Sequence, residues 1–399
     1  MREYKETLVK NVNIVDVKNG DIKEKQAILI SKGKIAEIGS SLTGGQSSTH
    51  VIDGESNFVV PGMADFHVHL NWDGSSDPTT TLMAEGPKIA TLRAYKNAMD
   101  HLRIGITTLV DVGSMDDLAI DLASAIRKGV IFGPRVFASG RIICIIGGHG
   151  AGPGLGYEIS GKDDALRATR TLIKNGADLL KISATSGAYG AYGAEKLESI
   201  QLDPEEIRTI TNEATKYNIK VTAHALNLEG IRNCVNNGVA IVHHGAFLDK
   251  EVAKLMQQKG TALVPTLLVY KKLSEDVPGV MPQAIKKASE VAKHQKEAFV
   301  NALEAGVRII GGTDAYSPNF GGFPKIIDEA IIMGEYGMPN EDVLRSITIN
   351  PAEALGIEDV SGIIEVGKDA DLVLLKNDPI KDLHNLNKVE KVIFRGIEM

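Results

Sequence analysis

The 399-residue sequence lacks several features that would assign it to a particular class of protein. It has only two cysteines, Cys144 and Cys234, which lie far apart and do not make a disulfide framework. It has no run of 18 or more apolar residues, so no transmembrane helix is expected. The first residues, MREYKETLVKNVNIVDVKNG, alternate apolar and charged residues and lack an apolar signal core. We therefore expect a cytoplasmic protein with no membrane partner.

Positive charge is also scarce. The formal net charge is −7, and no block of basic residues occurs, so we expect no nucleic-acid partner. The remaining composition, 43% hydrophobic and 24% charged, is that of a globular protein. The chain is long enough for one large domain or two ordinary ones.

The pattern of the chain changes twice along its length. Residues 1 to about 60 favour short strands, with a hairpin at the Lys-Gly pair of AILISKGKIAEIGS. Apolar runs then alternate with helical stretches, and one of these helices is predicted to begin at Asp203 and Pro204 as N-cap and first helical residue. After NPAEALGI, short strands return. Eight apolar runs can be counted in the middle section: GMADFHVH, GITTLVDVG, PRVFASGRIICI, ADLLKIS, IKVTAHAL, VAIVHHG, ALVPTLLV and VRIIGGTDA.

Eight strand–helix units indicate an α/β fold with a (β/α)8 TIM barrel, and a doubly wound sheet is the alternative. The strands at the two ends of the chain would then pair into one small β domain. We place the barrel at residues 61–352 and the β domain at residues 1–60 plus 353–399.

Metal-binding or titratable residues occur in five of the eight predicted strands. In a barrel of parallel strands, catalytic groups lie at the C-terminal ends of strands. His67 and His69 are two residues apart, so in a strand their imidazoles face the same side. The full set is His67 and His69 in the first strand, Lys181 in the fourth, His224 in the fifth, His243 and His244 in the sixth, and Asp314 in the eighth.

Each of these residues has a simpler explanation when taken alone. A single histidine in an apolar run is usually a hydrogen-bonded core residue, and Asp314 alone would be a turn residue after two glycines. Lys181 could pair with a neighbouring carboxylate, because buried lysines are rarely unpaired. The coincidence of all of them at one barrel rim favours a metal centre instead, and imidazoles with carboxylates suit zinc and similar ions. A neutral buried lysine can also add carbon dioxide, and the resulting carbamate could bridge two cations.

The chain resembles the amidohydrolase superfamily over nearly its whole length. The matching stretches are VVPGMADFHVHL, GITTLVDVG, ADLLKIS, VTAHAL, VHHG, GGTDA, ITINPAEALGI and GIIEVGKDADLVLL. The branch it resembles most contains imidazolonepropionase-like and Xaa-Pro dipeptidase-like (prolidase-like) proteins. The resemblance implies a TIM barrel joined to a composite β-sandwich domain built from both termini.

The resemblance also implies a set of ligands and a reaction. Two divalent ions, expected to be Zn²⁺, would activate a bridging water that attacks an amide carbonyl. Asp314 would act as general base and then general acid. Lys181 would be carboxylated, and His244 is preferred to His243 because the family ligand immediately precedes the glycine, here Gly245. The ligand set carried over is His67, His69, Lys181, His224, His244 and Asp314.

Three further residues are candidates for substrate binding. His149, in the loop GGHG after the third strand, would donate to the substrate carbonyl or carboxylate and is also a catalytic candidate. Its alternative role is to cap backbone groups of the glycine loop. Tyr189 and Tyr192, in SGAYGAYG after the fourth strand, would line the pocket, although loop aromatics often only pack.

The expected activity is hydrolysis of a C–N bond in a small amide, dipeptide-like or cyclic amide substrate, by a homo-oligomer. Xaa-Pro dipeptidase-like and N-acyl amino acid amidohydrolase activities are the leading forms. Relatives with dipeptidase activity commonly carry a polar residue at the position of Leu226, which argues against that activity here. The alternatives are a cyclic amidine deaminase, against which Lys181 argues, a lactonase or esterase, and a non-catalytic binding protein on the same barrel.

Overall fold

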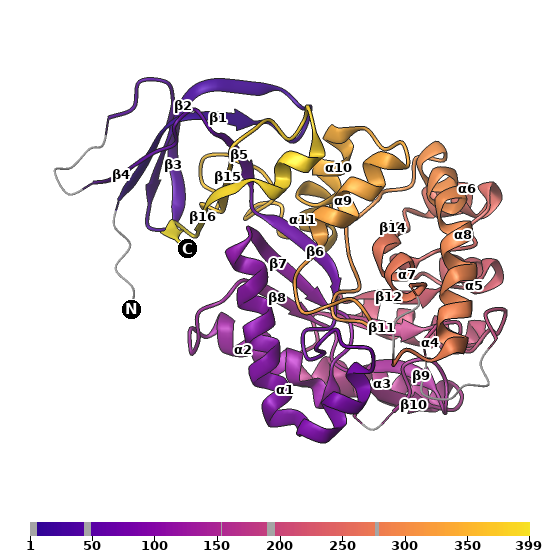
Figure 1. Ribbon diagram of the computed structural model, residues 1–399. Helices are drawn as coiled ribbons and strands as arrows, with labels where there is room; N and C mark the ends of the chain where they lie inside the picture. Colours follow the sequence, from indigo (N-terminus) through magenta and orange to yellow (C-terminus); the bar gives the residue numbers. More distant parts are fainter. Residues whose placement is uncertain (1–5, 44–48, 153, 190–195, 276–278) are drawn as a thin grey trace. The chain divides into compact units, whose positions relative to one another are not determined.

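The computed structural model describes residues 6–43, 49–152, 154–189, 196–275 and 279–399 (Figure 1). Its described residues divide into two compact units. The first comprises Met1–Asp65, Met99–Thr108 and Ile326–Met399, and the second comprises Phe66–Ala98 and Leu109–Lys325. Helices and strands occur in both units, as expected for an α/β protein.

The first unit contains one sheet with strands from both ends of the chain. The strand order is β17-β16-β15-β5-β1-β2-β3, and β4 pairs with β1. Figure 1 shows the indigo N-terminal strands and the yellow C-terminal strands in this sheet, where β5 pairs antiparallel with β15. The strands are β1 (Thr7–Val15), β2 (Ile22–Ser31), β3 (Lys34–Gly39), β4 (His50–Asp53), β5 (Phe58–Pro61), β15 (Leu372–Leu375), β16 (Val389–Phe394) and β17 (Ile397–Glu398).

The expected Lys-Gly hairpin is confirmed between β2 and β3. Ser31 pairs with Lys34, and the two residues between them, Lys32 and Gly33, have φ values of 51° and 78°. Two successive left-handed residues match the right-handed twist of the flanking strands. The hairpin therefore fixes which face of each strand is buried.

Apolar side chains from both ends of the chain share one core in this unit. Val9, Ile28 and Val59 from the N-terminal strands are fully buried in the same cluster as Leu372 and Ile393. Full burial of such a side chain stabilises the fold by about 1.5–3 kcal/mol relative to exposure. The helices of this unit are α9 (Ile326–Glu335), α10 (Asn340–Ser346) and α11 (Ile349–Leu355), with a 3₁₀ turn at Leu383–Asn387.

Two sheets lie mainly in the second unit, and the strands of the larger one are parallel. A six-stranded sheet has the order β10-β9-β11-β12-β13-β14, and a three-stranded sheet has the order β6-β7-β8. In the six-stranded sheet, the strand register places Lys181 beside Thr222 and His224 beside His243. The strands are β6 (Met63–Val68), β7 (Ile106–Asp111), β8 (Arg135–Ala138), β9 (Ile142–Ile145), β10 (Gly156–Ile159), β11 (Leu179–Ser183), β12 (Lys220–Ala225), β13 (Ile241–His244) and β14 (Ala262–Val264).

Backbone hydrogen bonds also join residues at the margins of these two sheets. The Asp178 N–H, just before β11, donates to Ala138 O at the end of β8 over 2.9 Å. On the other side, Ile310 N donates to Leu263 O of β14 over 2.9 Å, and Phe66 N of β6 donates to Gly311 O over 3.0 Å. The segment at residues 310–311 therefore bonds to both β14 and β6.

Three of the eight expected strands differ from the prediction. The run PRVFASGRIICI forms two strands, β8 and β9, because Gly140 takes a φ of 72° between them. The run ALVPTLLV is a strand only to Val264, since Pro265 has no N–H to donate and Thr266 turns the chain with a φ of 46°. The run VRIIGGTDA makes only isolated bridges at Ile309 and Ala315.

Helices follow most of these strands, as the alternating pattern predicts. In α4 the expected start is confirmed, because the Asp203 side chain accepts from Glu205 N and Glu206 N, and Pro204 is the first helical residue. In α1, Gly86 (φ 72°) and Pro87 interrupt the helix. The helices are α1 (Pro78–Arg103), α2 (Leu118–Arg127), α3 (Lys162–Asn175), α4 (Pro204–Thr215), α5 (Leu228–Asn236), α6 (Lys250–Lys259), α7 (Leu267–Leu273) and α8 (Pro282–Glu304), with a 3₁₀ turn at Met115–Asp117.

Other parts of the sequence-based model stay predictions. These are the closed barrel, the β-sandwich form of the composite domain, and the domain limits at residues 60 and 353. Among the described helices, none combines the length and the apolar character that crossing a bilayer requires.

Candidate metal centre and active site

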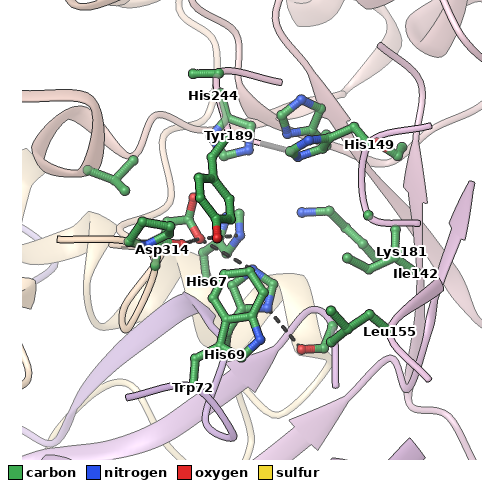
Figure 2. Close-up of a pocket in the computed structure, with 18 of the residues that line it drawn as sticks. His67, His69, Trp72, Ile142, His149, Leu155, Lys181, Tyr189, His244 and Asp314 are labelled. Atoms are coloured by element: carbon green, nitrogen blue, oxygen red, sulfur yellow. Dashed lines mark hydrogen bonds and ion pairs between the residues drawn. The ribbon is translucent and has the colours of Figure 1, made fainter. Parts of the chain in front are cut away.

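His67 and His69 lie at the end of β6 and line one pocket (Figure 2). Their spacing of two residues in extended chain brings both rings to the same side. The Nε2 atoms of His67 and His69 lie 3.4 Å and 3.3 Å from the same atom, Oδ1 of Asp314. One potential ligand atom from each of the three buried residues lies within 4.8 Å of the others. This geometry suits a cation held between two imidazoles and a carboxylate.

Hydrogen bonds on the far sides of the two rings orient these Nε2 atoms. His69 Nδ1 lies 2.9 Å from Gly113 O, and a carbonyl only accepts, so His69 carries a proton on Nδ1. His67 Nδ1 lies 2.8 Å from Nδ1 of His243. Burial and the charge of Lys181 hold the pKa of His67 well below its usual value. Burial also lowers the pKa of His69, but the hydrogen bond and charge of Asp314 outweigh it and raise that pKa overall.

A second pair of imidazoles comes from the neighbouring strands β12 and β13. His224 Nε2 lies 3.0 Å from Ser186 O and therefore donates, which leaves Nδ1 as the free nitrogen. His244 Nδ1 lies 2.7 Å from Thr266 Oγ1, which leaves Nε2. The two ring centroids are 4.5 Å apart. Burial, with nearby positive groups, holds both pKa values well below the usual range, so both rings are neutral, the form that binds metal.

Lys181 extends from the middle of β11 into the same pocket. Burial lowers its pKa to about 7, against a smaller opposing effect of the Asp314 charge. Within the described part of the chain, none of the ion pairs involves Lys181, so the salt bridge considered as an alternative is not formed there. A lysine amine that is largely neutral near pH 7 is a nucleophile.

Asp314 follows two glycines and has a left-handed backbone, with a φ of 61°. Its N–H donates to His67 O over 2.8 Å, and Ser317 Oγ donates to its Oδ1 over 2.7 Å. Burial raises the pKa of Asp314, but hydrogen bonds from His69 and Ser317 and the charge of Lys181 lower it overall. The side chain is therefore a carboxylate at neutral pH.

Two of the expected substrate-binding residues, His149 and Tyr189, line the pocket. The His149 ring lies 4.1 Å from the His224 ring, and its Nδ1 is buried without a partner among the described residues. Burial lowers the pKa of His149 to about 4, partly opposed by Asp314. Tyr189 lines the pocket, and its hydroxyl donates to Asp77 Oδ1 over 3.0 Å. Tyr192 lies outside the described residues.

Two pocket residues were missed by the sequence analysis. Trp72, the single tryptophan of the chain, stacks on His69 with ring centroids 4.8 Å apart and an interplanar angle of 27°. Tyr270, from α7, meets His244 edge-on at 5.5 Å. The position of Trp72 three residues after His69 was a usable signal. Tyr270 was hidden because the run before it was read as one continuous strand.

The neighbouring histidines of β13 have different surroundings. His244, with a φ of 71°, lines the pocket, whereas His243 is fully buried and bonds to His67 from outside it. Leu226, the position expected to be polar in a dipeptidase, is also fully buried and is not among the residues that line the pocket.

The pocket thus collects all six residues predicted as ligands, together with His149 and Tyr189. Figure 2 shows Lys181, His149 and His244 around the same space as His67, His69 and Asp314. The pocket leaves about 100 Å³ for the centres of water-sized molecules, so it is a concave site of the kind that small-molecule substrates occupy. Four imidazoles, one carboxylate and one amine that can become a carbamate make a donor set that fits divalent cations.

Comparison with known proteins identifies the family of this chain. Residues 58–398 match the model of the amidohydrolase family, and the chain belongs to that family. Ochratoxinase of Aspergillus niger is 26% identical over 393 residues, covering 92% of this chain and 79% of the relative. Imidazolonepropionase of Idiomarina loihiensis is 24% identical over 429 residues, covering 98% and 96%.

Among solved structures, a Xaa-Pro dipeptidase with bound methionine in the active site is similar along its whole length. It is 30% identical, with a TM-score of 0.89, and the match covers 99% of this chain and 100% of the other. The predicted membership of the prolidase-like and imidazolonepropionase-like branch is confirmed. The chain is accordingly an amidohydrolase-family hydrolase.

Proposed function

We propose that this protein is a two-metal hydrolase that cleaves the C–N bond of an amide. The observation that carries the proposal is the convergence of the donor set on one pocket, with the far nitrogen of each ring already hydrogen-bonded. His67 and His69 would hold one divalent ion and His224 and His244 the other, with Zn²⁺ the ion expected. The relative described as a Xaa-Pro dipeptidase supports an amide as the bond attacked.

The residues of the chain have distinct tasks in such a reaction. When bound, two cations supply an acidified water and polarise the carbonyl of the substrate. Lys181 would add carbon dioxide through its neutral Nζ, forming an N–C bond and releasing a proton, and the resulting carbamate would be a further anionic ligand. Asp314 accepts a proton on its carboxylate and passes it to the leaving nitrogen. His149 bonds to the substrate through its unpartnered Nδ1.

We also propose that the second unit is a closed (β/α)8 barrel. Two backbone contacts support closure. The Asp178 N–H, just before β11, donates to Ala138 O of β8, and the segment at residues 310–311 bonds to both β6 and β14. In this arrangement the four proposed histidine ligands lie at or next to the C-terminal ends of strands, where barrel enzymes carry their active sites.

Lys181 favours an amidase over a deaminase. A cyclic amidine deaminase of this superfamily typically works with one ion and no bridging lysine, whereas Lys181 here lines the pocket with the imidazoles. Release of ammonia would distinguish the two reactions, because an amidase acting on a substituted amide releases an amine instead.

The test uses metal-depleted protein reloaded with Zn²⁺ in bicarbonate. We expect about two ions per chain and hydrolysis of at least one compound in a panel of N-acyl amino acids, dipeptides, lactams and neutral anilides. A chelator should abolish the activity, and added zinc should restore it. His67→Gln should lose metal, whereas the matched variant His294→Gln, in an exposed part of α8, should retain it. A metal content near zero that added zinc cannot raise would contradict the proposal.

A further inference from the structure

The walls of the pocket are apolar beyond the proposed ligands. Trp72, Ile142, Leu155, Val269 and Leu273 line it, together with the ring of Tyr189. Figure 2 shows Ile142 and Leu155 on one side of the space and Trp72 beneath it. These side chains come from β9, α7 and the segments after β6, β9 and β11, so the apolar character is shared by several elements. A part of the substrate that extends from the proposed metal centre toward these walls contacts apolar side chains.

The same walls offer no fixed positive charge. Among the described residues that line the pocket, Lys181 is the only lysine, and there is no arginine. Lys181 is assigned to the metal centre and becomes an anion when carboxylated. Residues 190–195 (GAYGAE) and 276–278 (DVP), which lie outside the described residues, contain no lysine or arginine.

The hydroxyl of Tyr189, which lines the pocket, already donates to a carboxylate. Tyr189 OH donates to Oδ1 of Asp77, which also accepts from the backbone N–H of Thr80 at the start of α1. A substrate carboxylate at this position would compete with Asp77 for one donor and would be repelled by it. The surroundings of the Tyr189 hydroxyl therefore do not favour an anion.

We propose that the substrate is a neutral amide whose groups on either side of the scissile bond are apolar or aromatic, and not an amide that ends in a free carboxylate. This inference rests on the proposed function, because it concerns what the same hydrolytic pocket accepts. The physical reason is that a buried carboxylate without a paired cation loses its hydration with little compensation. An aryl or alkyl group of the same size is stabilised by the apolar walls.

The test compares matched anilides with the zinc-loaded full chain. On the amine side the pair is 4-methylacetanilide and 4-acetamidobenzoate, and on the acyl side it is valeranilide and succinanilate. Each pair replaces a small hydrocarbon group with a carboxylate of similar size. We expect kcat/KM to be higher for the neutral member of both pairs by about tenfold or more, which corresponds to at least about 1.4 kcal/mol. Equal or faster cleavage of a carboxylate member in either pair would overturn the inference.

Hydrolysis of none of the four compounds would count against the proposed function, and binding then decides the inference separately. Trp72 is the only tryptophan and lies in the pocket, so its fluorescence reports occupancy directly. Tighter dissociation constants for the two neutral anilides would support an uncharged substrate. Equal or tighter binding of the carboxylates would overturn it.

A gain-of-function variant tests the role of the wall itself. Ile142 is only partly buried, so it is a tolerant position for a cation. The measured quantity is the ratio of kcat/KM for the carboxylate substrate to kcat/KM for its neutral partner. We expect this ratio to be about tenfold higher in Ile142→Lys than in Ile142→Met, which has an uncharged side chain of similar length. The same ratio in both variants would overturn the assignment of the substrate's flanking group to this wall.

Discussion

Nδ1 of His243 lies 2.8 Å from Nδ1 of His67, so the two buried imidazoles share one proton. If His67 binds metal through Nε2, it must be the donor and His243 the acceptor. His243→Ala removes the acceptor, and loss of such an outer partner typically costs about 10–100-fold in metal affinity. His243→Asn should recover part of this loss, because the amide oxygen can occupy the position of Nδ1. Zinc affinity measured by competition with a chromophoric chelator checks the prediction.

Thermal unfolding of the metal-free forms is the control for His243. The side chain is fully buried, so His243→Ala also leaves a cavity that lowers stability without involving the metal. Unchanged zinc affinity in a folded His243→Ala protein would show that the hydrogen bond to His67 does not orient the ligand.

Asp314→Asn separates metal binding from proton transfer. The amide keeps the size of the side chain but cannot take up a proton, so the variant should keep most of its metal and lose about 10²–10⁴-fold in rate. The loss should be smaller for anilides with activated leaving groups, which need less protonation. Rates on a poor and a good leaving group, measured in the metal-replete variant, decide the matter. Equal fractional losses on both would indicate that another residue protonates the leaving nitrogen.

Carboxylation of Lys181 should depend on pH in the metal-free protein. The reactive form is the neutral amine, and burial lowers the pKa of Lys181 to about 7. At a fixed concentration of dissolved carbon dioxide, carbamate formation should therefore rise as pH increases through about 7. An unfolded lysine would require a pH near its usual value of about 10.4.

The carbamate can be followed by NMR with ¹³C-bicarbonate, and Lys181→Met, which removes the amine, identifies its signal. Folding stability of the metal-free protein should also rise with pH between the folded pKa of Lys181, about 7, and its unfolded pKa, about 10.4. In this range the unfolded chain binds more protons than the folded chain. A carbamate signal that persists in Lys181→Met would assign the modification to a different lysine.

Gly113→Ala should weaken the metal centre through a steric effect. A Cβ atom at this position would lie 2.8 Å from Cδ1 of Ile142 and 3.0 Å from Cε1 of His69. We expect lower zinc affinity and lower activity, because the His69 ring must move. The matched control is Gly322→Ala, where the nearest heavy atom is 3.9 Å away and little change is expected. Zinc content and reaction rate of the two variants, measured side by side, check the prediction. Equal activity of the two variants would contradict it.

The metal-binding candidates could be predicted because their spacing carries geometric information. Alternation along a strand brings His67 and His69 to one side, and parallel strands bring Lys181 and His224 to the same edge of the sheet. A polar residue within an apolar run can be recognised from the sequence alone. The pocket lining of the structure includes all of these residues.

The rest of the site depends on backbone geometry that the sequence does not display. His244, Asp314 and Thr266 have φ values of 71°, 61° and 46°, which are unusual for residues other than glycine. The turn at Thr266 begins α7 and brings Tyr270 to the pocket, so reading that run as a strand concealed it. The contact between His243 and His67 joins residues far apart in the chain, and no local pattern indicates it.

The pairing of β5 with β15 has a consequence for how the protein is made. Phe58 leaves the ribosome early, yet its partner Leu375 is added only when almost the whole chain has been synthesised. At roughly 5–20 residues per second, the edge of β5 that β15 will cover stays unpaired on the order of tens of seconds during synthesis. The apolar cluster around Val59 is exposed for the same interval, because it is completed by Leu372 and Ile393. Nascent chains should therefore be most prone to aggregate, and most dependent on chaperones, late in translation.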